Sequence, residues 1–368
     1  MVRKFLYLNG IAIIAVILFH ASGWGFTSMF PWAHRYLPIG ADAYQRIGSF
    51  SYYFLRVIEQ LVMFSIPVFL FVSGYFVAFN TPAKEKTIAW KSVLNRIKFL
   101  AIPYILWSTL FLLANLLEGK RPTPLGLVEI YLTGSITPAY YFVILLIQFY
   151  LLSPFLVPLA KNHWKSLLLV TGIIQIIFHL LQYLFILQPD SATSLLLIKL
   201  FPKWLFIVRI FWFSLGLVIA FHRNEFKKIF EIKTIAWISL AIVLFFLGIL
   251  EWEWLIKFSG LNWIETRETL LDAVYSMTVL FAILSTNKIL PLRNFIEKIG
   301  SQSFGIYLAH IPVTQYLARG IYHFAPWLLS QTILFTLIIA VAGLGLPLFG
   351  MWIFRKPLLK RVYGYVFG

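Results

Sequence analysis

The sequence has no cysteine and few charged residues. Without cysteine, disulfides, thiolate metal sites and an acyl-thioester intermediate on the protein are all excluded. Charged residues make up 12% of the 368 residues and hydrophobic ones 60%, whereas soluble domains carry about 25% charge. There is also no phosphate-binding loop, Gly-rich dinucleotide turn or zinc-ligand spacing. The composition therefore predicts a polytopic membrane protein with no bound metal and no bound cofactor.

Acidic residues are scarce, with 14 Asp and Glu against 31 Lys and Arg, which gives a net charge of +17. The cations do not form a basic face for nucleic acid but fall in short segments between apolar runs, which is typical of orientation signals in a lipid bilayer. With the N-terminus inside, 20 of the 31 lie on the cytoplasmic side. This bias predicts that both termini are cytoplasmic. Arg3 and Lys4 also resemble the start of a signal peptide, but the many equivalent runs that follow favour a retained first helix.

Long apolar runs dominate the chain. A run of about 20 apolar residues is long enough to cross a bilayer. The sequence predicts about ten spans, at 5–26, 58–79, 99–118, 139–160, 166–187, 204–222, 234–250, 269–286, 302–323 and 330–354. We therefore expect an all-α helical bundle over residues 1–368, with no appended soluble domain. The aromatic outer loop at 27–57 either covers a cavity or forms an interfacial belt.

His20 and His310 both lie within predicted spans, where a titratable group rarely occurs without a partner or a task. His20 is fifteen residues from Phe5, or roughly 22 Å along the helix, which places it in the outer half. A neutral imidazole there is a candidate general base; the alternative is a structural histidine bonded to a neighbouring helix. His310 lies about eight residues into its span, so the two imidazoles are predicted at different depths.

Other polar residues are candidates for the second catalytic group and for the donor site. Glu59 is predicted to orient His20, as the acid of a dyad does, or alternatively to pair with Arg56 at the interface. Ser73 and Tyr75 lie in VSGYF near the inner end of the second predicted span, where close helix packing is the simpler explanation.

The charged candidates lie at both ends of the bundle. Arg96 and Lys98 follow the second predicted span on the cytoplasmic side, where they are candidates for binding the phosphates of an acyl donor or serve only as orientation charges. Arg209 and Asp272 are predicted near the outer ends of their spans, and either a charge pair or a sugar contact is open for each.

Five segments together resemble acyltransferase family 3, a family of integral membrane proteins. They are LNGIAIIAVILFH, IPVFLFVSGYF, NRIKFLAIPYILWS, AYYFVILLIQFYLLSPFL and SFGIYLAHIPV, in that order along the chain. The resemblance maps the essential histidine of the family onto His20. It implies a bacterial inner-membrane enzyme that moves an acyl group, typically acetyl, from cytosolic acyl-CoA to a hydroxyl of a cell-surface glycan. Among the donor-binding candidates it implies are Arg96, Lys98, Ser73, Tyr75 and His310.

The sequence departs from the family pattern at two positions. Asn9 stands where members often have arginine eleven residues before the histidine, and Phe99 stands at another position that is often arginine. The loss of these cations indicates a changed donor or a weakened activity, and Asn9 leaves open a weakened family member acting within a synthase complex. A separate alternative is a polysaccharide or lipid-linked sugar transporter in which His20 relays protons.

Overall fold

A computed structural model describes residues 2–32, 47–264 and 267–368, and within these ranges the chain is helical without a β-strand. Part of the predicted outer loop at 27–57 therefore lies outside the described residues. The longer helices are α1 (Val2–Thr27), α2 (Phe50–Val62), α3 (Ser65–Phe79), α4 (Trp90–Leu117), α6 (Tyr141–Asn162), α7 (Trp164–Leu187), α9 (Ile210–Phe221), α11 (Thr234–Ser259), α12 (Leu270–Ser285), α14 (Ser303–Phe324) and α15 (Thr332–Phe354). The shorter ones are η1 (Ser28–Trp32), α5 (Pro124–Thr133), α8 (Ala192–Leu200), η4 (Phe206–Arg209), α10 (Lys227–Glu231), α13 (Arg293–Gly300), η5 (Pro326–Ser330) and α16 (Lys360–Phe367).

Seven helical segments in the described ranges are long and apolar enough to cross a membrane, counting α2 and α3 together. Each of the ten predicted runs overlaps a helix, so the membrane-bundle class is confirmed. The count of ten spans and the cytoplasmic termini stay predictions. The run at 58–79 is not one continuous helix, because Pro67 has no N–H to bond the carbonyl of Met63, and the chain breaks between α2 and α3. The run at 234–250 extends further, as α11 ends at Ser259.

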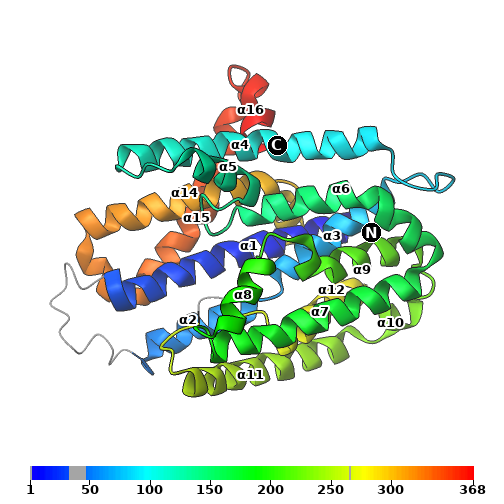
Figure 1. Cartoon of the computed structure of the whole chain (residues 1–368), viewed down its shortest axis with the longest axis horizontal. Helices are drawn as coiled ribbons and strands as arrows, with labels where there is room; N and C mark the ends of the chain where they lie inside the picture. The colour runs from blue at the N-terminus through cyan, green and yellow to red at the C-terminus, as the bar shows by residue number, and fades with distance from the viewer. Residues whose placement is uncertain (1, 33–46, 265–266) are drawn as a thin grey trace.

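Helix α1 is the central helix of the bundle. It packs against α2, α3, α13, α14 and α15, and Figure 1 shows it running through the middle of the molecule. In its most apolar window 61% of the residues are buried, against 11% for α11, which therefore lies at the periphery. Glycines bring α13 onto α1: a Cβ on Gly10 would collide with the carbonyl of Ile296, and one on Gly300 with the carbonyl of Leu6.

A second close crossing joins α3 to α9. A Cβ on Gly74 would overlap the carbonyl oxygen of Phe213, and a Cβ on Gly216 would overlap that of Phe71. The two glycines therefore allow the backbones to approach at one crossing point, from which both helices pack along their length. The motif VSGYF, which contains Gly74, thus acts first as a helix-packing element.

Prolines inside the helices leave carbonyl groups without their intrahelical donor, and at two of these carbonyls a hydroxyl group from another segment donates instead. Pro312 frees the carbonyl of Leu308, to which the Tyr140 hydroxyl donates at 2.7 Å. In α6, Pro158 has no N–H to bond the carbonyl of Pro154, and the Thr87 hydroxyl donates to that carbonyl at 2.6 Å. In a bilayer such partners are needed because no water bonds an exposed carbonyl in the hydrocarbon region.

Candidate active site

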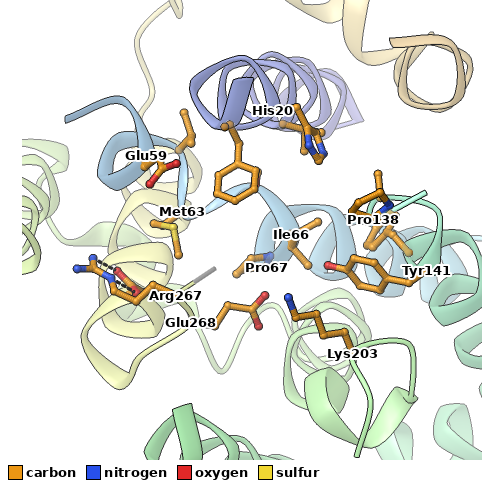
Figure 2. A pocket seen from close by; sticks show the side chains of 18 of the residues that line it. His20, Glu59, Met63, Ile66, Pro67, Pro138, Tyr141, Lys203, Arg267 and Glu268 are labelled. Atoms are coloured by element: carbon orange, nitrogen blue, oxygen red, sulfur yellow. Dashed lines mark hydrogen bonds and ion pairs between the residues drawn. The ribbon is translucent and has the colours of Figure 1, made fainter. Parts of the chain in front are cut away.

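A cavity of about 390 Å³ lies beside the second half of α1, and we call it the histidine cavity. This volume is within the usual range for small-molecule sites. Its lining combines aromatic rings with ionisable groups. The ionisable and aromatic residues are Phe19, His20, Trp24, Glu59, Tyr141, Phe142, His179, Lys203, Arg209, Trp212, Trp263, Arg267, Glu268, Asp272 and Tyr307. Figure 2 shows His20 and Glu59 on one side of this space and Lys203 and Glu268 on the other.

The His20 imidazole faces the cavity and is free to bind a substrate. No described residue makes a hydrogen bond to it, and its ring lies 5.2 Å, centroid to centroid, from that of His310. His310 is fully buried, and its Nδ1 lies 2.6 Å from the carbonyl oxygen of Tyr307. Because a carbonyl only accepts, this nitrogen carries the proton, and Nε2 has no partner. The prediction that the two histidines lie at different depths was therefore wrong.

Glu59 lines the histidine cavity from α2 but bonds Ser22, whose hydroxyl lies 3.4 Å from its Oε1. The alternative pairing with Arg56 is wrong, because the guanidinium of Arg56 forms its ion pair with Glu253. The structure contains no hydrogen bond between Glu59 and His20 within the described residues. The Glu59 carboxylate therefore contacts α1 at Ser22, two residues beyond His20.

Arg209 forms a charge pair with Glu268 at the cavity surface. The two approach to 2.5 Å, and Arg209 also donates to the carbonyl of Lys203 at 2.7 Å. Burial opposes ionisation of the Glu268 carboxyl, but the neighbouring guanidinium outweighs it and holds its pKa below the usual range. In Figure 2 the Lys203 ammonium and the Glu268 carboxylate point toward one another. Lys203, Arg209 and Glu268 therefore form a charged edge of the histidine cavity, and Arg209 is one of the two predicted acceptor-side residues.

Asp272, the other predicted acceptor-side residue, is held by Arg267. The guanidinium donates to both carboxylate oxygens, at 2.7 and 3.0 Å, and to the carbonyl of Gly248 at 2.7 Å. It also donates to Gln60. This network joins α2, α11 and α12. Of the predicted alternatives, a charge pair or a sugar contact, the charge pair is present for both Asp272 and Arg209. Direct contact with a sugar stays a prediction for both.

A second cavity, of about 350 Å³, lies beside the first half of α1, and we call it the arginine cavity. Two predicted donor-binding residues, Ser73 and Arg96, line it. Arg96 donates to the carbonyl of Phe76 at 3.1 Å and lies over the Tyr150 ring. Asn9, at the position where the family pattern often has arginine, also lines this cavity, and its Oδ1 is buried without a partner.

The remaining donor-binding candidates lie elsewhere. Tyr75 stacks on Phe5 with ring centroids 3.9 Å apart and lines neither cavity. Lys98 is exposed and also lines neither cavity, because residues two apart on a helix, such as Arg96 and Lys98, point to different faces. His310 lies beside His20 rather than beside Arg96. The donor set predicted from sequence is thus reduced to Ser73 and Arg96.

The two cavities follow one another along the same four helices. Helices α1 and α14 line the arginine cavity nearer their N-terminal ends and the histidine cavity nearer their C-terminal ends. Helices α3 and α6 line the histidine cavity first along the chain and the arginine cavity after it. Asn9 and His20 are eleven residues apart on α1, a separation of about 16 Å along the axis. The cavities are therefore stacked along the direction in which the helices cross the bundle.

Sequence reasoning did not single out Arg267, Glu268, Lys203 and Tyr141, which all line the histidine cavity. Arg267 and Glu268 lie just before the start of α12. The sequence signal for these two residues was a pair of opposite charges just before an apolar span. The fold alone shows that Arg267 pairs with Asp272 and Glu268 with Arg209. Within the described residues, no group of three or more His, Asp and Glu side chains is arranged to hold a metal ion.

Comparison with known proteins shows the family directly. The family model described as the acyltransferase domain matches residues 5–353, nearly the whole chain. The chain belongs to acyltransferase family 3. In this family member the match covers the residues that line both cavities.

Curated relatives are more distant. The chain is 25% identical over 316 residues to the probable poly-beta-1,6-N-acetyl-D-glucosamine export proteins of Staphylococcus aureus strains MRSA252 and MSSA476. Each alignment covers 83% of this family 3 chain and 85% of the relative. No solved structure matches the chain.

Proposed function

We propose that this protein is a membrane acyltransferase that moves an acyl group, acetyl in the simplest case, from cytosolic acyl-CoA to a hydroxyl of a cell-surface glycan. The donor occupies the arginine cavity, and the glycan hydroxyl enters the histidine cavity. The proposal includes a location in a bacterial inner membrane with the N-terminus inside, as the Lys and Arg bias predicts.

His20 is the general base in this proposal. It takes the proton of the acceptor hydroxyl while that oxygen attacks the thioester carbon, and the C–S bond breaks as the C–O bond forms. The proton then passes to the departing sulfur, so that acyl-CoA and the alcohol become an ester and free CoA. His310, 5.2 Å away by ring centroids, provides a second nitrogen to which the proton moves. A variant of the same chemistry has His20 accept the acyl group first.

The observation that carries the proposal is the position of His20. Its imidazole faces a cavity whose lining includes several ionisable groups, has no hydrogen bond to any described residue and lies on the helix that also lines the arginine cavity through Asn9. An imidazole held for packing alone needs a hydrogen-bond partner in lipid, as His179 has in the carbonyl of Glu268 at 2.6 Å.

Two features support an acyl donor on one side and a sugar on the other. Arg96 gives the arginine cavity a cation for a phosphate group. The histidine cavity combines Trp24, Trp212 and Trp263 with the carboxylates of Glu59 and Glu268, a combination of flat apolar faces and hydrogen-bond acceptors that suits a sugar ring.

The test is acyl transfer in membrane vesicles from cells that produce the protein. Vesicles receive radiolabelled acetyl-CoA and a β-1,6-linked N-acetylglucosamine oligomer, and label in the oligomer is counted. We expect label with the wild type and none above background with His20→Ala, which must be recovered at wild-type levels in the membrane. Transfer by the His20→Ala variant at the wild-type rate contradicts the assignment of the base.

A second candidate, export of a polysaccharide, is favoured by one observation: the curated relatives are called probable export proteins. In that case vesicles translocate the same oligomer without acyl-CoA, and no label is transferred to it. Translocation that is independent of acyl-CoA supports export, whereas labelled oligomer without translocation supports the transferase.

A further inference from the structure

The two cavities are separated by side chains. Among the described residues, Phe142 of α6 and Tyr307 of α14 are the pair that lines both cavities. Their ring centroids lie 5.6 Å apart with the planes at 59°. Both rings are at most 5% exposed. We call this pair the aromatic wall.

The two rings are held differently. The Tyr307 hydroxyl donates to the carbonyl of Ala139, so that ring is fixed at its far end. The Phe142 ring has no polar anchor and packs against Phe69, with centroids 5.9 Å apart. Rotation or shortening of Phe142 therefore opens the wall without breaking a hydrogen bond.

The catalytic histidines lie next to the wall. The Tyr307 ring is 5.7 Å, centroid to centroid, from the His310 ring, which in turn is 5.2 Å from that of His20. His310 also bonds the backbone carbonyl of Tyr307. A thioester that reaches His20 from the arginine cavity therefore has to pass Phe142 and Tyr307.

We propose that Phe142 and Tyr307 determine which acyl groups the enzyme transfers, an inference that rests on the proposed function. The acyl group is the leading end of the thioester, so it has to pass between these two rings before it reacts beside His20. A two-carbon group displaces the packed rings least, and each further methylene requires more displacement. In a hydrophobic pocket one methylene changes selectivity by about 10- to 200-fold.

The experiment compares acetyl-, butyryl- and hexanoyl-CoA as donors to the β-1,6-linked N-acetylglucosamine oligomer, with kcat/KM as the readout. The variants are Phe142→Ala and the milder Phe142→Leu, which decides the question if the alanine variant does not fold. Tyr307→Phe keeps the ring but removes its anchor. The matched control is Phe304→Leu, because Phe304 lines the arginine cavity alone.

We expect the ratio of kcat/KM for hexanoyl-CoA to that for acetyl-CoA to rise by about tenfold or more in the Phe142 variants. A smaller rise is expected for Tyr307→Phe, and a change under twofold for Phe304→Leu. An unchanged ratio in folded Phe142 variants, or an equal rise in Phe304→Leu, overturns the role of the wall while the proposed function stands. Absence of transfer from every thioester by the wild type overturns both.

Discussion

The imidazole rings of His20 and His310 lie 5.2 Å apart, although 290 residues separate them in the chain. The pairing depends on α13, which enters the bundle and packs on α1 through Gly10 and Gly300. Helix α14 begins three residues after Gly300, at Ser303. The start of α14 is therefore set close to Leu6 and Gly10 of α1, and this brings His310 level with His20.

The first prediction concerns this pair. His20→Gln should lower kcat/KM for acyl transfer by about 10²- to 10⁴-fold, the usual contribution of a general base. His310→Gln should lower it by less, because it removes the second proton site but not the base. The measurement is radiolabel transfer by purified protein in lipid nanodiscs.

The control for the pair is His222→Gln, since His222 bonds the carbonyl of Ala160 at 2.9 Å and lines neither cavity. We expect it to keep the wild-type rate. If His310→Gln is inactive and His20→Gln retains activity, the roles of the two histidines are reversed.

The second prediction concerns the donor. Arg96→Ala should raise KM for acetyl-CoA by about tenfold, because a charge-assisted hydrogen bond to phosphate contributes roughly 1.5–3 kcal/mol. The value of kcat should change less. Lys98→Ala is the matched control, since that side chain is exposed on the same helix and lines neither cavity. A larger effect of Lys98→Ala than of Arg96→Ala places the phosphates elsewhere.

The third prediction concerns the crossing of α3 and α9. Gly74→Ala should destabilise the protein by about 1–3 kcal/mol, as overpacking does, because the added methyl meets the backbone of Phe213. Gly345→Ala is the control: nothing lies within 4 Å of its Cβ position in α15. It should be neutral or stabilise the helix by up to about 1 kcal/mol. Thermal unfolding in detergent measures both, and equal midpoints for the two variants refute the packing role.

The fourth prediction concerns the pH dependence of the Arg209–Glu268 pair. Burial disfavours the Glu268 carboxylate, but Arg209 outweighs it, so the folded-state pKa lies below that of the unfolded chain. The stabilisation is therefore present above the unfolded-state value of about 4.3 and is lost as the pH falls through the lower folded-state pKa.

A double-mutant cycle of Arg209→Gln and Glu268→Gln tests it. We expect a coupling free energy of about 2 kcal/mol at pH 7, below the 3–5 kcal/mol for breaking a fully buried pair, because the Glu268 side chain is 31% exposed. The coupling should remain at pH 5.5 and decrease below about pH 4. A coupling that does not change over this range shows that the charge on Glu268 is not responsible.

Some of the site was predictable from the chain. The apolar runs predicted the helical membrane bundle, because span length is a property of local composition. The five ordered segments were sufficient to identify the family. Ser73 and Arg96 line one cavity, while their role in donor binding and the role of His20 as the base stay predictions.

Other assignments failed because they depend on rotation about the helix axis and on relative height. Tyr75 is two residues from Ser73, and Lys98 is two from Arg96, so each points to another face of its helix. Counting residues from a predicted span end also misplaced His310, because α13 sets the start of α14 close to Leu6 and Gly10 rather than beside the first residues of α1.

The sequence by itself determined that the chain forms a bundle of apolar helices with a titratable group in the first one, because hydrophobicity and length act locally. The tertiary structure decided that His310 lies beside His20, that Arg209 and Asp272 are neutralised by Glu268 and Arg267, and that two aromatic rings divide the interior. These depend on how closely helices approach, and backbone contacts at a few glycines set that distance.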